Sequence, residues 1–119
     1  MQTPLLQDHV EEVSGEVLAV QVYPFEIEII YFHAAARAEA GLRAKHGLVW
    51  ADGPRNWTQL TLAEIQSDVI GRTLSGFSLA SGRASVLVGD RRAEIIQEGP
   101  TEFIELWWTI DGAPRRVYL

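Results

Sequence analysis

Residues 16–33 read EVLAVQVYPFEIEIIYFH, two runs in which side chains alternate between two faces, separated by a proline. The first run, Glu16 to Tyr23, is rich in β-branched residues. The second, Phe25 to His33, places apolar side chains on one face and two glutamates on the other. A period of two residues is typical of a strand with one buried face. Pro24 interrupts the pattern, so we expect a bend there and an N-terminal β-hairpin.

Downstream of the hairpin, the composition changes to that of helices. Residues 34–46, AAARAEAGLRAKH, consist mostly of strong helix formers and end before Gly47, a residue typical of a helix C-terminus. Thr61 and Glu64 then match a capping box, and apolar residues follow at helical spacing as far as Gly71. The sequence therefore predicts one or two helices between residues 34 and 71.

The period-two pattern returns after residue 73. Turn-forming pairs separate the candidate strands Ser75 to Ala80, Ala84 to Val88, Arg91 to Glu98, Thr101 to Ile110 and Arg115 to Leu119. This spacing predicts a four- to five-stranded antiparallel meander, and Pro114 indicates that its last strand begins late or lies at an edge. We therefore expect a single α+β domain over residues 1–119 with helices packed on one face, and residues 1–14 as a frayed lead-in or short helix.

Composition excludes several classes of protein. The chain of 119 residues has no cysteine, so it has neither disulfides nor a thiolate zinc site. It contains no run of about 18 apolar residues, and residues 1–8 lack the basic start and apolar run of a signal peptide. We expect a cytoplasmic protein with no membrane partner. Nine arginines against one lysine are typical of a GC-rich bacterial or phage genome.

The net charge of −6 is concentrated near the N-terminus. Residues 1–36 contain no Lys or Arg, and their acids are Asp8, Glu11, Glu12, Glu16, Glu26 and Glu28. If Glu16, Glu26 and Glu28 lie on neighbouring strands, they form an anionic face that repels nucleic acid and attracts a basic protein.

The stretch TEFIELWWTI, residues 101–110, has two different faces. One carries Ile104, Leu106, Trp108 and Ile110, which we expect in the core. The other carries Phe103, Glu105, Trp107 and Thr109. Large aromatics beside a carboxylate fit an interaction surface or the wall of a ligand pocket, and a covering helix would instead make this face part of the core.

No set of residues indicates catalysis. No serine lies in a G-x-S-x-G motif, no loop matches a phosphate-binding pattern, and His9, His33 and His46 match no metal-ligand spacing. The sequence therefore favours a protein that is not an enzyme, with no catalytic residues, cofactor or metal.

Three functional hypotheses follow. The first is a non-catalytic protein-binding module of the immunity-protein, inhibitor or adaptor type, which binds a basic protein through Glu16, Glu26, Glu28, Phe103, Glu105 and Trp107. The second is a ligand-binding or small enzymatic domain with an aromatic-lined pocket, whose further residues are Tyr31, His33, Trp50 and Asp52. The third is a homo-oligomeric or phage structural subunit in which the strand at Arg115 to Leu119 pairs with its copy.

Overall fold

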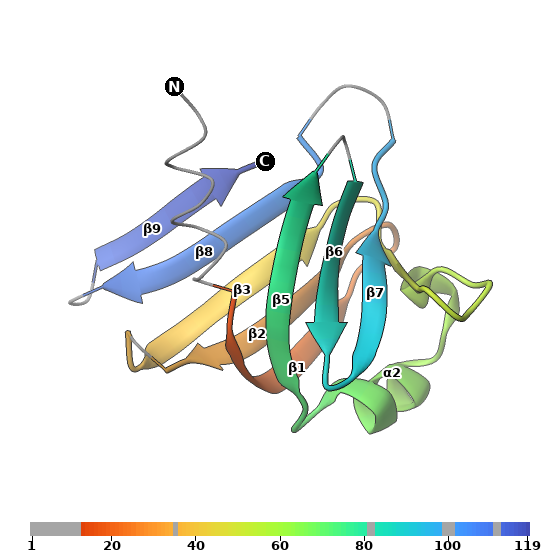
Figure 1. The fold of residues 1–119 in the computed structure, drawn as a ribbon, viewed down its shortest axis with the longest axis horizontal. Helices are drawn as coiled ribbons and strands as arrows, with labels where there is room; N and C mark the ends of the chain where they lie inside the picture. The colour runs from red at the N-terminus through yellow and green to blue at the C-terminus, as the bar shows by residue number, and fades with distance from the viewer. Residues whose placement is uncertain (1–12, 35, 81–82, 99–101, 111–112) are drawn as a thin grey trace.

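The computed structural model describes residues 13–34, 36–80, 83–98, 102–110 and 113–119. All nine strands belong to one antiparallel sheet in the order β4-β7-β6-β5-β1-β2-β3-β8-β9 (Figure 1). The strands are β1 (Gly15–Val22), β2 (Ile27–His33), β3 (Ala38–Ala44), β4 (Leu48–Trp50), β5 (Thr73–Ala80), β6 (Arg83–Val88), β7 (Arg91–Ile95), β8 (Ile104–Ile110) and β9 (Ala113–Tyr118).

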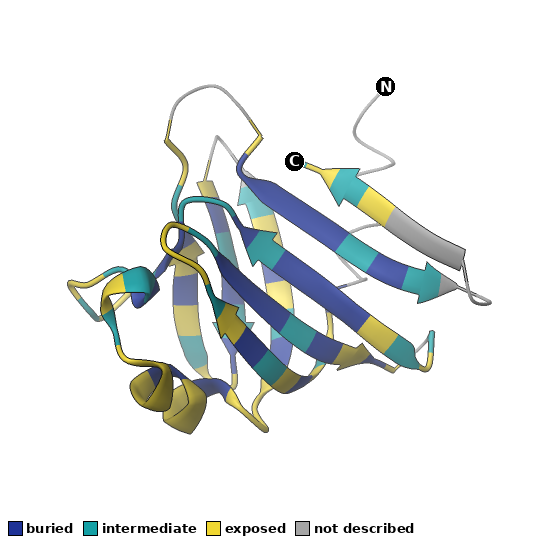
Figure 2. Cartoon of the chain, turned by 180° about the vertical axis from the view of Figure 1, so that it is seen from behind, coloured by how far each residue is buried: buried dark blue, intermediate teal, exposed yellow. Residues whose placement is uncertain are grey.

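The sheet folds back on itself at β1, so that it forms two layers (Figures 1 and 2). Strands β1, β2, β3, β8 and β9 make one layer, and β5, β6, β7 and β4 make the other. All of β1 runs alongside β2, and the two layers are joined where the first residues of β1, Gly15 and Glu16, also pair with Leu74 and Thr73 of β5. A bulge between Val17 and Ala19 interrupts the β1–β2 register, and such an irregularity increases strand twist and bending.

Gly15 allows the sheet to turn at this place. Its φ of +153° lies in a region that L side chains rarely adopt, and a Cβ atom there would lie 1.8 Å from the carbonyl oxygen of Phe32. Only glycine lets the two backbones approach this closely. The first pair of residues in the β1–β2 ladder therefore depends on the absence of a side chain.

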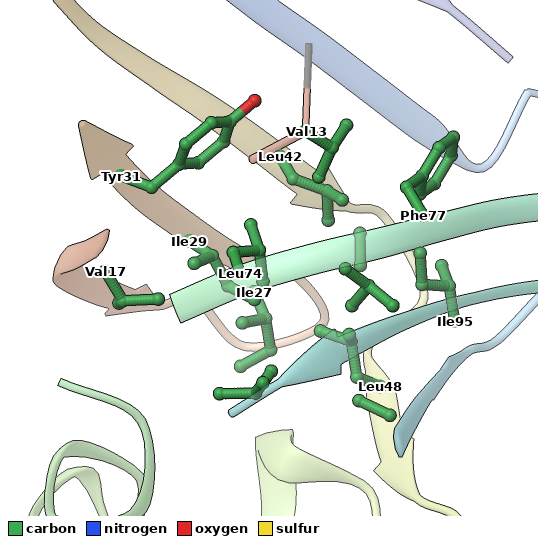
Figure 3. Packing of buried hydrophobic residues seen from close by; sticks show 14 of the residues in the cluster. Val13, Val17, Ile27, Ile29, Tyr31, Leu42, Leu48, Leu74, Phe77 and Ile95 are labelled. Atoms are coloured by element: carbon green, nitrogen blue, oxygen red, sulfur yellow. The ribbon is translucent and has the colours of Figure 1, made fainter. Parts of the chain in front are cut away.

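The hydrophobic core lies between the two layers. Figure 3 shows Ile27, Ile29 and Leu42 of the first layer in the same interior as Leu74 and Phe77 of β5. Residues paired across β2, β3 and β8 share a face, so one inner row consists of Ile29, Leu42 and Leu106, all at most 1% exposed. The alternate residues of these strands point outward, and their outer surface is described below.

One α-helix, α2 (Leu62–Val69), and one 3-10 helix, η1 (Trp57–Gln59), complete the described structure. The predicted capping box is confirmed, because the Glu64 amide donates to the Thr61 hydroxyl and the Thr61 amide donates to the Glu64 carboxylate. The helix adds Ile65 and Val69 to the core, and Figure 1 shows it beside β1. Neither helix in the described ranges has the length and apolar character needed to cross a membrane.

The predicted α+β class with helices packed on one face is wrong. The described chain is mostly a nine-stranded sheet in which the N-terminal hairpin and the C-terminal strands are continuous, in place of a hairpin followed by a four- to five-stranded meander. The expected lead-in at residues 1–14 falls almost wholly outside the described residues, although Val13 is buried in the core. The predicted edge position of the last strand is confirmed, since β9 ends the sheet.

The helix predicted over residues 34–46 is also wrong, because β3 occupies most of it. Within this stretch the core side chains of Ala40, Leu42 and Ala44 alternate with Gly41 and Arg43 on the opposite face of the sheet. This is the period-two pattern of a strand, although most of the residues are strong helix formers. In the sheet β3 pairs with β2 on one side and β8 on the other. The backbone hydrogen bonds and buried apolar contacts of a central strand outweigh intrinsic helix propensities, which amount to less than about 1 kcal/mol per residue.

Candidate functional site

The candidate site is the surface of the first layer that points away from the core, which we call the outer face (Figure 2). Register places its side chains in cross-strand rows. One row contains Glu28, Arg43 and Glu105, and the next contains Ile30, Gly41 and Trp107. A third row, one step nearer the β2–β3 turn, contains Glu16, Phe32 and Glu39.

Arg43 is at the centre of a group of ionised side chains on this face. Its Nη2 lies 3.9 Å from Glu28 Oε1, its Nη1 lies 3.8 Å from Glu105 Oε1, and its Nε lies 3.5 Å from Glu26 Oε2 without hydrogen-bonding geometry. The guanidinium also lies 5.3 Å from the centre of the Tyr23 ring, within cation–π range. One cation thus lies at ion-pair distance from carboxylates of three different segments.

A second arginine completes this arrangement. Arg116 of β9 donates a hydrogen bond of 2.7 Å to Glu105 Oε2, and Glu105 is only 4% exposed although it lies on the outside of the sheet. Charge-assisted contacts of this length compensate the loss of hydration of a carboxylate. We call Glu26, Glu28, Arg43, Glu105, Trp107 and Arg116 the Arg43 cluster.

The two arginines of the cluster are firmly protonated. Burial by itself lowers the pKa of Arg43, but the carboxylates around it, Glu28 foremost, raise it above the ordinary value. The hydrogen bond to Glu105 is the main cause of the raised pKa of Arg116. The cluster therefore keeps its cations at all physiological pH values.

Trp107 links the cluster to the neighbouring row. Its indole Nε1 donates a hydrogen bond of 2.7 Å to Glu28 Oε2. The indole lies directly over Gly41, where a Cβ atom would come within 2.1 Å of Nε1. Glycine on β3 therefore provides the space in which the ring lies against the sheet.

Except for Glu26, the residues of the Arg43 cluster line a surface depression of about 350 Å³, together with Thr109. Larger depressions of the described surface lie elsewhere, among them one of about 600 Å³ beside Arg83, Arg92 and Glu94 and one of about 410 Å³ beside Phe25 and His46. In the described part of the chain, no three His, Asp or Glu side chains come together as a metal-ligand group. The side chains on the outer face supply ionic, hydrogen-bonding and apolar contacts.

The structure brings together most of the residues expected to bind a partner. Glu26, Glu28, Glu105 and Trp107 belong to the Arg43 cluster, and Glu16 lies two rows away on the same face. Phe103 does not share this face, because it precedes β8 and is 4% exposed in the core. The acidic hairpin is also less anionic than its composition indicates, since Arg43 pairs with two of its three glutamates.

The four residues expected to line a ligand pocket lie in two settings. Tyr31 and His33 are buried on β2, and the His33 Nδ1 accepts a hydrogen bond from the Ala36 amide. Trp50 of β4 lies below the Arg91 guanidinium, 3.9 Å from its ring centre, and Arg91 donates a 2.9 Å hydrogen bond to Asp52. That hydrogen bond is the main cause of the lowered pKa of the exposed Asp52 carboxyl.

Several residues of the outer face were not found by sequence reasoning, namely Phe32, Glu39, Gly41, Arg43 and Arg116. Glu39, Gly41 and Arg43 lie in the stretch predicted as a helix, and a helical assignment does not place them on one common face. The alternation of Ala40, Leu42 and Ala44 with these residues was the sequence pattern that could have revealed the strand. Comparisons of the chain with protein-family models, with curated proteins and with solved structures found no match.

Proposed function

We propose that this chain is a non-catalytic protein-binding module of the immunity-protein, inhibitor or adaptor type, and that its partner lies on the outer face. The observation that carries the proposal is the exposure of apolar side chains in the middle of a sheet. Leu18 and Phe32 are each 42% exposed, and the half-buried Ile30 and Trp107 lie in the adjoining row. Aromatic and aliphatic groups gathered on one surface, with charged groups around them, are typical of protein interfaces.

The rigidity of this face supports the same function. The Trp107 indole donates a hydrogen bond to Glu28 and packs against Gly41. The buried carboxylates of Glu28 and Glu105 are in turn paired with Arg43 of β3 and Arg116 of β9. Side chains that are already ordered lose less conformational entropy when a partner binds. Such a surface suits recognition by a preformed sheet, with no need for a loop to fold.

A specific observation favours self-association through β9 as a second candidate. The Leu119 amide and carbonyl hydrogen-bond to the start of β8, so residues at alternate positions, including Arg116 and Tyr118, direct their backbone groups to the open edge. Pro114 also falls at such a position, where its missing N–H breaks no bond to β8. This proline shortens the edge available to a second copy, so we rank this candidate below the outer face.

Native mass spectrometry of protein purified from its own host tests the proposal. We expect a protein partner in fixed ratio with the wild-type chain, loss of that partner in Phe32→Ser, and its retention in Phe25→Ser. Phe25 is the matched control, because it is 79% exposed but lies in the β1–β2 turn. Retention of the partner by Phe32→Ser would contradict the proposed surface, and a bare homo-oligomer would favour pairing through β9.

A further inference from the structure

The third row of the outer face has an unusual arrangement of charge around an aromatic ring. Phe32 of β2 lies directly opposite Glu16 of β1 on one side and Glu39 of β3 on the other. Residues directly opposite in antiparallel strands share a face, with Cβ atoms about 5 Å apart. An exposed phenyl ring therefore lies between two carboxylates that are exposed as well.

These two carboxylates differ from the others on the outer face because they lack cations. Glu26, Glu28 and Glu105 pair with Arg43 or Arg116. Within the described ranges, no Lys, Arg or His lies at ion-pair distance from Glu16 or Glu39, and this includes Arg37 in the adjacent turn. The row therefore has a total uncompensated charge of −2, one negative charge at each end.

The backbone around the ring is held firmly. Phe32 belongs to a strand with neighbours on both sides, and its carbonyl lies against Gly15 so closely that no side chain fits there. Leu18, the extra residue of the β1 bulge, is exposed nearby. The ring and the two carboxylates thus form a preformed site with apolar surface beside it.

We propose that the row Glu16–Phe32–Glu39 binds a lysine or arginine side chain of the protein partner. This inference rests on the proposed function and names the chemistry of its central contact. A cation above an aromatic face is attracted by the ring quadrupole, and here two carboxylates add to that attraction. The aliphatic stem of the same side chain can cover Leu18.

Charge decides between the occupants that an apolar sheet face could accept. A second copy of this chain would bring its own uncompensated carboxylates to the contact, and a nucleic acid would bring phosphates. Like charges opposed at an interface destabilise it by several kcal/mol. A basic segment of a different protein is the occupant that this charge favours.

A peptide titration followed by the backbone amide NMR signals tests the inference. The probe is a blocked pentapeptide of alternating leucine and arginine, and its control has citrulline, a neutral analogue, in place of each arginine. We expect the arginine peptide to shift the amides of Glu16, Phe32 and Glu39 and to bind about tenfold more tightly than the citrulline peptide. The double variant Glu16→Gln/Glu39→Gln reduces that difference to the part contributed by the Phe32 ring, whereas the control Glu94→Gln, on the outside of the other layer, preserves it in full.

Two results would overturn the inference. Equal binding of both peptides at these amides would show that the face takes apolar chains without using the cation, and the proposed function would stand. No shift of these amides at millimolar arginine peptide would also reject the cation site. The proposed function is then decided separately, by the Phe32→Ser and Phe25→Ser comparison.

Discussion

The close approach of Trp107 to Gly41 leads to a quantitative prediction for Gly41→Ala. A Cβ atom at this position would lie 2.1 Å from Trp107 Nε1, 2.3 Å from Cε2 and 2.7 Å from Cζ2. No indole carbon or nitrogen tolerates such distances, so the ring must leave its place. The hydrogen bond of 2.7 Å between Nε1 and the Glu28 carboxylate is lost when it does.

The expected effect is a loss of stability, in contrast to an ordinary Gly→Ala change in a strand. Loss of a hydrogen bond to a charged acceptor costs about 1.5–3 kcal/mol. The reduced entropy of the unfolded chain returns about 0.5–1 kcal/mol. We expect a net decrease of about 1.5 kcal/mol in the free energy of unfolding, which corresponds to about 6 °C in Tm for a chain of 119 residues.

A double-mutant cycle with Trp107→Ala measures this coupling. Urea unfolding followed by far-UV circular dichroism is the suitable assay, because removal of a tryptophan changes the fluorescence itself. In the Trp107→Ala background, Gly41→Ala should be neutral or stabilising. Unchanged stability of Gly41→Ala in the wild type, or the same loss in both backgrounds, would refute the contact that we assign to the indole.

Three further predictions concern other contacts. Arg43→Met should lower stability by about 2 kcal/mol in thermal unfolding, because it leaves the Glu28 and Glu105 carboxylates without their shared cation; a variant as stable as wild type would argue against the Arg43 cluster. Thr61→Ala should lower the Tm by about 4 °C at neutral pH. The Thr61 backbone and hydroxyl lower the pKa of Glu64 from 4.5, so the stabilising effect of the carboxylate is complete above that pH and is lost as the pH falls through the lowered pKa. Thr61→Ala removes only the hydroxyl's contact with that carboxylate and the charge-independent bond from the Glu64 amide, so the difference in Tm should become smaller in acid without vanishing; a difference that does not shrink would contradict the contact between hydroxyl and carboxylate. Trp57→Phe should cost only about 1 kcal/mol against about 4 kcal/mol for Trp57→Ala, because the fully buried indole N–H has no hydrogen-bond partner to lose; equal losses by calorimetry would reject this.

Part of the outer face could be predicted from the alternation of residues within single strands. The expected alternation of Glu105 and Trp107 with core residues in β8 is present, so their shared outward face follows from the sequence. The partners that bury Glu105 come from β3 and β9, at positions that local pattern does not relate to it. The same is true of Glu39, whose position beside Phe32 depends on the pairing of β2 with β3.

The sequence by itself was sufficient to predict those elements that depend on residues only a few positions apart. The alternation in residues 16–33, the capping box at Thr61 and the edge position of Pro114 all agree with the structure, because strand period, helix capping and the missing proline N–H act over short range. Contacts distant in sequence decided the rest. They made residues 38–44 a central strand, folded the sheet at Gly15 into two layers, and left Glu16 and Glu39 as uncompensated charges on either side of Phe32. Pairing between distant strands outweighs propensity, since burial and ladder hydrogen bonds together exceed the small intrinsic preference of alanine for a helix.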